Sequence, residues 1–189
     1  ANHIKARKDV FYRLKNSSNI CWRLILWMFS MKFIKLVKEK STSIAGTPKC
    51  LIIDDSMLEK TGRYMEKVSR MFDHVSKRFL LGFKLLTMGY WDGITFIPLD
   101  FSLHREKGTN ANKPFGLKKK EYKKQYRKIR GNGSYNDVRA KEADMSKIES
   151  ALKMFWHAIS QGLKVDYILM DSWFTCDAFI KAVKRVKKQ

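Results

Sequence analysis

Two stretches of sequence decide the fold: Cys50-Leu51-Ile52-Ile53-Asp54-Asp55 and Tyr167-Ile168-Leu169-Met170-Asp171. Each is a short run of large apolar residues that is closed by a carboxylate. Runs of this length and composition predict buried strands. A buried strand that ends in Asp brings the charge to the edge of its sheet. If the two strands are neighbours, the carboxylates of Asp55 and Asp171 come together.

Paired carboxylates are suited to binding hard cations, since Mg²⁺ and Mn²⁺ prefer oxygen ligands. Two such ions about 3.5–4 Å apart activate an attacking oxygen and stabilise a leaving oxygen at phosphorus. Asp55 and Asp171 are therefore candidate ligands. Asp54 is the alternative to Asp55, because strand alternation puts only one of them on the active face. The structural alternatives are a turn-initiating role for the Asp54-Asp55 pair and a helix N-cap role for Asp171, shared with Ser172.

The charge balance predicts a polyanionic partner. The chain has 189 residues, with 39 Lys and Arg against 18 Asp and Glu, which gives a net charge of +21. Because neutralising phosphates releases counterions, nucleic acid is the favoured partner. The alternative is a basic surface that only keeps the protein in solution.

The cysteines and the apolar segments indicate an intracellular protein. Cys21, Cys50 and Cys176 are widely spaced and form no Cys-x-x-Cys motif, which argues against a disulfide framework and a zinc site. The most apolar stretch, residues 20–29, is too short to span a bilayer and is interrupted by Arg23. We therefore expect a cytoplasmic, nucleoid-associated protein with no membrane partner.

The order of the predicted elements indicates an α/β fold. Residues 1–40 have helical periodicity, and the small polar segment 41–48 reads as a linker, so we predict a boundary near residue 46 between a helical segment, 1–45, and a domain, 46–189. The predicted elements that follow the first strand are an excursion at 56–62, strands at 79–90 and 94–103 joined by a hairpin at Trp91-Asp92-Gly93, an amphipathic helix at 144–162, the strand 167–171 and a helix from about Cys176. A helix that crosses over before a strand favours parallel pairing.

Residues 105–135 form a strongly basic insertion. A long charged insertion within a compact domain is either functional or disordered. Tyr122 and Tyr126 lie inside it and are free to pack or to stack on bases. The candidate DNA-binding residues of this run are Lys113, Lys118, Lys119, Lys120, Lys123, Lys124, Arg127, Lys128 and Arg130. The alternative is a solvated helix face.

Four short words of sequence, taken in order, resemble the bacterial insertion-sequence transposases of the DDE superfamily. The words are Ile52-Ile53-Asp54-Asp55-Ser56, Glu59-Lys60-Thr61-Gly62, Phe96-Ile97-Pro98-Leu99-Asp100 and Leu169-Met170-Asp171-Ser172-Trp173-Phe174. The resemblance covers roughly residues 45–189. It suggests that the preceding helices are the tail of a DNA-binding region.

The resemblance implies a ribonuclease-H-like fold, α/β with a mixed sheet flanked by helices and preceded by an N-terminal helical segment. It also implies metal-dependent cleavage and transfer of double-stranded DNA, at the ends of an insertion sequence and at its target, with Mg²⁺ or Mn²⁺ as cofactor. By the same resemblance Asp55 matches the first metal-binding carboxylate and Asp171 the second. The full-length protein would be a possible homodimer.

One departure from the family pattern limits this expectation. The family needs a third acid, a Glu on a helix well beyond the second Asp, and after Asp171 the chain offers only Asp177. We therefore expect a C-terminally incomplete fragment that does not cut DNA. The competing hypothesis is a non-catalytic, basic nucleic-acid-binding domain that carries carboxylates at strand ends.

Overall fold

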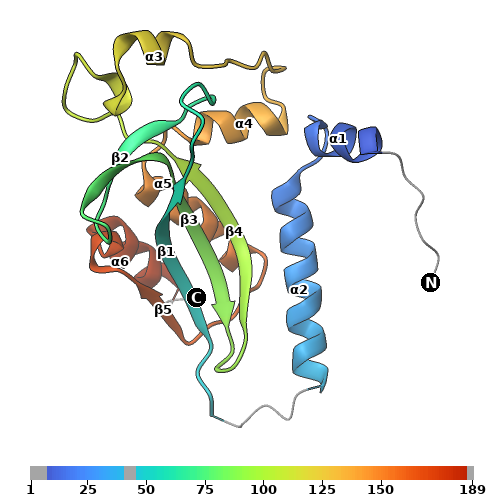
Figure 1. The fold of residues 1–189 in the computed structure, drawn as a ribbon. Helices are drawn as coiled ribbons and strands as arrows, with labels where there is room; N and C mark the ends of the chain where they lie inside the picture. Colours follow the sequence, from blue (N-terminus) through green and yellow to red (C-terminus); the bar gives the residue numbers. More distant parts are fainter. Residues whose placement is uncertain (1–7, 41–45, 187–189) are drawn as a thin grey trace.

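Five strands form one mixed sheet at the centre of the fold (Figure 1). The computed structural model describes residues 8–40 and 46–186. The strands are β1 (Cys50–Glu59), β2 (Ser69–Asp73), β3 (Arg78–Trp91), β4 (Phe96–His104) and β5 (Tyr167–Met170). The helices are α1 (Lys8–Asn16), α2 (Trp22–Lys40), α3 (Lys119–Lys123), α4 (Tyr135–Glu142), α5 (Lys147–Ser160) and α6 (Asp177–Val186), with short 3₁₀ turns η1 (Pro114–Gly116) and η2 (Ser172–Phe174).

The long strand β3 organises the sheet. It pairs antiparallel with β1, β2 and β4, while β1 pairs parallel with β5. Helix α5 lies in the crossover that leads to β5, as the sequence predicted from its helix-then-strand order. The α/β class, the mixed sheet with flanking helices and the preceding helical segment are thereby confirmed, and the architecture is ribonuclease-H-like.

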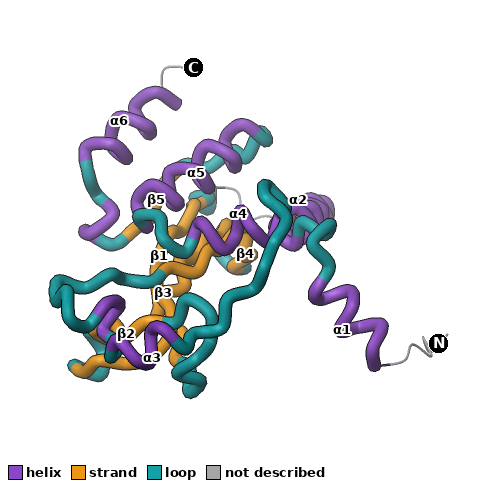
Figure 2. Tube along the Cα trace, turned by 90° about the horizontal axis from the view of Figure 1, so that it is seen from above, coloured by secondary structure: helices purple, strands orange, loops and turns teal. Residues whose placement is uncertain are grey.

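One face of the sheet carries the main core. Leu51 and Ile53 are fully buried and point to the same face, because side chains alternate along a strand. Helices α2 and α5 pack over this face, with α6 beside α5 (Figure 2). Trp27 of α2, Phe155 of α5 and Phe179 of α6 all join the same apolar cluster. Because Asp55 stands two residues beyond Ile53, it lies on the same face of β1 as this core.

The structure corrects the predicted end of the first strand. Residues 56–62 were expected to be an excursion, but β1 continues to Glu59 and stays in register with β3, with Met57 opposite Lys84 and Leu58 opposite Phe83. The stabilisation from ten residues of pairing with β3 outweighs the tendency of the polar residues Asp54, Asp55 and Ser56 to end a strand. Strand β2 was not predicted at all, because its five residues alternate too briefly to give a clear signal.

Pro98 lies at a position of the sheet that tolerates its missing backbone N–H. It lies on β4, which pairs only with β3 within the described residues, and the register shifts between Met88 and Gly89 at the same point. An edge strand and a bulge both tolerate the missing N–H of proline. A Cβ on Gly89 would lie 2.2 Å from the ring of Phe96, so the residue opposite Pro98 has no room for a side chain.

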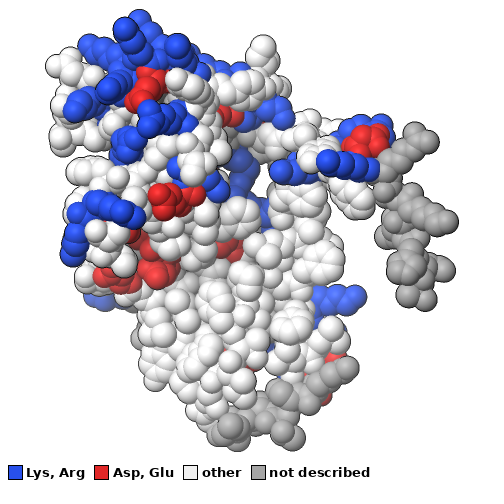
Figure 3. All heavy atoms as spheres, in the orientation of Figure 1, with Lys and Arg blue, Asp and Glu red and all other residues white. Residues whose placement is uncertain are grey.

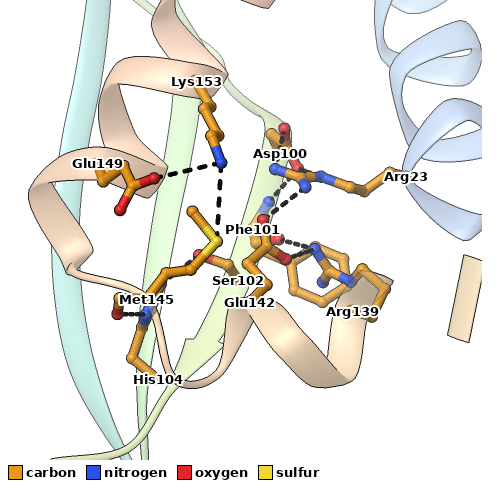
Figure 4. Close-up of polar contacts among 10 residues, drawn as sticks. All are labelled: Arg23, Asp100, Phe101, Ser102, His104, Arg139, Glu142, Met145, Glu149 and Lys153. Carbon is orange, nitrogen blue, oxygen red and sulfur yellow. Dashed lines mark hydrogen bonds and ion pairs between the residues drawn. The ribbon is translucent and has the colours of Figure 1, made fainter. Parts of the chain in front are cut away.

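Buried charges fix α2 to the sheet (Figure 4). Nε and Nη2 of Arg23 donate to the two carboxylate oxygens of Asp100 at 2.5 and 2.7 Å. Its Nη1 donates to Glu142 at 2.7 Å, and Arg139 donates to the second oxygen of Glu142 at 2.7 Å. Burial lowers the pKa of Arg23, but Asp100 and Glu142 outweigh it and hold that pKa above the usual value. Two guanidinium groups thus balance two carboxylates.

The basic insertion is a folded lobe rather than a disordered segment. It contributes to a second apolar cluster, formed by Val68, Leu81, Phe83 and Leu117 with Leu103 and Tyr122 beside them. The buried amide of Gln125 donates to the carbonyl of Val68 at 2.6 Å. These contacts hold the lobe on the turn of chain before β2 and on β3.

The predicted linker lies partly outside the described residues, which omit 41–45. Helix α2 shares the main core through Trp27 and Ile34, whereas the assignment of 1–45 to a DNA-binding region stays a prediction. No helix within 8–40 or 46–186 is both long and apolar enough to cross a membrane.

Candidate functional site

Asp55 and Asp171 lie on two neighbouring parallel strands. The pairing of β1 with β5 matches Ile53 to Met170, so Asp171 follows the last paired residue of β5 and Asp55 stands two residues beyond Ile53. The predicted adjacency of the two strands is thus present. Asp55 lies within β1 rather than at its end, because β1 runs on beside β3.

A lysine forms an ion pair with Asp55. Lys147 begins α5, and its Nζ donates to Oδ2 of Asp55 at 2.7 Å; the two side chains are only 16% and 18% exposed. The same ammonium lies 4.3 Å from the ring centroid of Trp173, in a cation–π contact. It also acts electrostatically on Asp171. One positive charge therefore contacts Asp55 of β1 and Trp173 of η2.

Asp171 is held in its ionised form by its surroundings. The hydroxyl of Ser172 donates to Oδ1 of Asp171 at 3.0 Å. This bond, with the backbone N–H groups of Trp173 and Ser172 and the charge of Lys147, holds the pKa of Asp171 below its usual value. Asp171 also occupies the N-cap position of η2, where its carbonyl accepts from the N–H of Phe174 at 2.9 Å. The N-cap position leaves its carboxylate exposed.

Asp54 faces away from this cluster. It is exposed, and its Oδ1 accepts a hydrogen bond from the backbone N–H of Asp55 at 2.7 Å. Since neighbouring strand residues point to opposite faces, the contact of Asp55 with α5 directs Asp54 to the other side of the sheet. Asp54 and Asp55 thus do not converge.

The start of α5 is fixed by a buried histidine (Figure 4). His104 is 2% exposed, and burial lowers its pKa. Its Nδ1 lies 3.0 Å from the carbonyl of Met145, which can only accept, so Nδ1 carries the proton. Nε2 then accepts from the hydroxyl of Ser102 at 2.6 Å. This chain of bonds anchors the segment two residues before Lys147.

The donor atoms suit a hard cation, and the site already holds a positive charge. The acidic side chains of the cluster offer only carboxylate oxygens, the ligand type that Mg²⁺ and Mn²⁺ take. The ammonium of Lys147 contacts the carboxylate of Asp55 at 2.7 Å, and its charge contributes to the lowered pKa of Asp171. Across the described parts of the chain, no three His, Cys, Asp or Glu side chains gather closely enough to hold a metal ion. Two carboxylates are therefore available and a third is not.

The predicted DNA-binding residues mostly share one exposed surface, here named the basic lobe, residues 105–135. Figure 3 shows Lys and Arg side chains gathered over α3, with Asp and Glu side chains below them on the same face. The exposed members of the predicted set are Lys113, Lys118, Lys119, Lys120, Lys123, Lys124, Arg127 and Lys128. Arg130 differs, because it forms a two-point ion pair with Glu66, at 2.7 Å for one of the two contacts, and is half-buried.

The two tyrosines of the basic lobe have different environments. Tyr122 is half-buried and stacks on Phe115, with ring centroids 5.4 Å apart. Tyr126 is 64% exposed, and its backbone N–H donates to the carbonyl of Tyr64 at 2.8 Å. Tyr122 therefore packs, and only Tyr126 has a ring face open to a ligand.

Sequence reasoning missed Lys147. Trp173, which is 52% exposed, faces its ammonium. A signal for Lys147 did exist. The positive end of the helix dipole disfavours a lysine at the start of a helix, and Lys147 directly follows the N-cap residue Ser146. A lysine in that position needs anionic partners from elsewhere in the fold.

Comparison with known proteins agrees with this arrangement. The family model described as DDE superfamily endonuclease matches residues 15–188. Neither the curated proteins nor the solved structures contain a match to the chain. The family match spans both strands that carry the aspartates, the basic lobe and helix α2. By this match, the chain belongs to the DDE superfamily of endonucleases.

Proposed function

We propose that the chain is the catalytic core of an insertion-sequence transposase, in which Asp55 and Asp171 hold Mg²⁺ or Mn²⁺. The observation that carries the proposal is the parallel pairing of the two strands that carry the aspartates, together with the 2.7 Å ion pair between Asp55 and Lys147. Family membership supports DNA as the substrate, since the family consists of endonucleases. Asp54 is a weaker candidate, because it faces away from Lys147.

Each group has a definite role in this proposal. A divalent ion at the site would supply a Lewis acid for attack by water or a 3′-hydroxyl on a DNA phosphodiester. Asp55 offers its oxygens from a rigid central strand, and Ser172 orients the carboxylate of Asp171. Packing of α5 against the core keeps this end of the sheet in a fixed geometry.

The basic lobe would bind the DNA backbone. Its exposed cations lie on the same face as an acidic area of the surface (Figure 3). Phosphate contacts position a duplex without reading its sequence. Tyr126 could stack on an unpaired base. Arg130 has a structural role instead, since its guanidinium is occupied by Glu66.

We further propose that residues 1–189 bind metal weakly and do not cut DNA. Glu residues are absent from the sequence after Asp171, and the described residues bring no third carboxylate to the pair. The alternative, a non-catalytic nucleic-acid-binding domain, is favoured by the same lack of a third acid. Metal binding by the two aspartates distinguishes the two functions.

The test is a calorimetric titration with Mn²⁺ of the wild type and of three variants. Asp55→Asn and Asp171→Asn should each abolish the binding heat, because each removes one of two charged ligands. Asp54→Asn is the matched control and should leave the heat unchanged. Binding that survives in both Asp55→Asn and Asp171→Asn would contradict the proposed site. Nicking of supercoiled plasmid by the wild type, lost in Asp171→Asn, would contradict the proposed lack of cleavage.

A further inference from the structure

Lys147 is a charged side chain that the proposed chemistry does not use. It begins an α-helix, where the helix dipole opposes a positive charge. It is nevertheless largely buried, and a buried ammonium is costly unless it is paired. Asp55 pairs with the ammonium at 2.7 Å, and the ring of Trp173 lies 4.3 Å from it. The ammonium thus lies directly on one of the two candidate metal ligands, next to the η2 turn that follows the other.

We propose that Lys147 is a built-in counter-ion of Asp55, which competes with the divalent cation for that carboxylate. The inference rests on the proposed function, because it takes Asp55 and Asp171 as the metal ligands. Without metal, the ammonium neutralises the partly buried carboxylate of Asp55. Oδ2 of Asp55 would become available to a divalent ion only once Nζ of Lys147 leaves it.

The competition has two opposite consequences that a purely structural lysine would not have. Replacing Lys147 with an uncharged residue frees the carboxylate of Asp55, so the protein should bind metal more tightly. The same replacement leaves the partly buried carboxylate of Asp55 without its ion-pair partner, so the metal-free protein should be less stable. A lysine that served only to hold α5 in position would lower both metal affinity and stability when it is removed.

The experiment compares Lys147→Met with the wild type by counting free Mn²⁺ through its electron paramagnetic resonance signal. Removing a unit charge in contact with a ligand should lower the Kd for Mn²⁺ by about tenfold or more, given the size of charge interactions at 4 Å in partly buried sites. Lys153→Met is the matched control, because Lys153 lies on the same helix, is 60% exposed and contacts Glu149 at 3.4 Å. It should leave the Kd for Mn²⁺ unchanged.

Thermal unfolding in EDTA and in saturating Mn²⁺ gives the second readout. Lys147→Met should unfold at a lower temperature than the wild type in EDTA and should gain more from Mn²⁺. Lys147→Arg keeps the charge and should keep the weak affinity of the wild type, which tests the proposal even if Lys147→Met does not fold.

An equal or weaker affinity in Lys147→Met overturns the counter-ion role, while the metal site stands if the wild type still binds Mn²⁺ through Asp55 and Asp171. Tighter binding by Lys147→Arg also overturns the counter-ion role. If neither the wild type nor any variant binds Mn²⁺, the proposed metal site and the inference drawn from it both fail.

Discussion

Replacing Arg23 with alanine should destabilise the protein severely. The guanidinium makes three contacts with Asp100 and Glu142, at 2.5 to 2.7 Å, and those two carboxylate side chains are only 7% and 6% exposed. Removing it leaves Glu142 with Arg139 as its ion-pair partner and takes from Asp100 the ion pair that it makes with Arg23. Breaking a buried ion pair from one side costs about 3–5 kcal/mol of the free energy of unfolding. That is a large share of the ~5–15 kcal/mol by which a native protein is stable.

The assay is thermal unfolding followed by circular dichroism. For a chain of this size 1 kcal/mol corresponds to about 2–4 °C, so the midpoint should fall by roughly 6–20 °C. Arg13→Ala is the matched control, since Arg13 also pairs with an aspartate on an N-terminal helix, at 3.2 Å, but both side chains are more than half exposed. An exposed pair of this kind contributes about 0.3–0.5 kcal/mol, so its midpoint should move by no more than about 2 °C.

A double substitution should restore most of the stability that Arg23→Ala loses. In Arg23→Leu combined with Asp100→Leu, Glu142 keeps Arg139 as its partner, and the stability should recover most of the loss, because an apolar pair often replaces a buried ion pair without cost. If Arg23→Ala unfolds within 2 °C of Arg13→Ala, the buried network does not hold α2 to the sheet.

Two further predictions concern the basic lobe. The first replaces Lys119, Lys120 and Lys123 together by Gln. The slope of log K against log salt for binding to duplex DNA, measured by fluorescence anisotropy, should fall by about 0.9 per lost phosphate contact. An unchanged slope would indicate that these lysines do not contact DNA and only form a solvated surface. The pKa of Glu66 is lowered by its hydrogen bond with Arg130, so this pair stabilises the fold fully above the unfolded value of 4.5 and is lost as the pH falls through the lower, folded value. Urea unfolding at pH 7 and pH 3 should therefore show a smaller penalty for Glu66→Gln at pH 3, and an equal penalty at both would contradict the assignment.

The sequence predicted the elements whose signals are local. The apolar runs before Asp55 and Asp171 identified β1 and β5, and the periodicity of 144–162 identified α5. The crossover order then predicted their parallel pairing. Eight of the nine basic residues chosen from the charge run are exposed. The ninth, Arg130, pairs with Glu66, and the local sequence could not predict this pair because the two residues are 64 positions apart.

The remaining features depend on contacts between distant residues. Arg23 and Glu142 are 119 residues apart, and Asp55 and Lys147 are 92 apart. The local sequence does not identify such partners: an arginine on an amphipathic helix is usually solvated, and the position of Lys147 at a helix start indicates that it needs an anion but not which one. The end of β1 was wrong for a similar reason: Asp54, Asp55 and Ser56 look like a strand end until the length of β3 is known.

The parallel pairing of β1 with β5 has a consequence for the order in which a nascent chain acquires its parts. The N–H of Lys49 donates to Asp166, 117 residues later, so β1 leaves the ribosome long before its partner. At about 5–20 residues per second, that gap lasts roughly 6–23 s. The β3–β4 hairpin and the basic lobe are complete within it, and β1 has β3 beside it but still lacks β5. If the basic lobe binds DNA as proposed, a growing chain would attach to DNA before Asp55 and Asp171 are brought together, which happens only after β5 emerges.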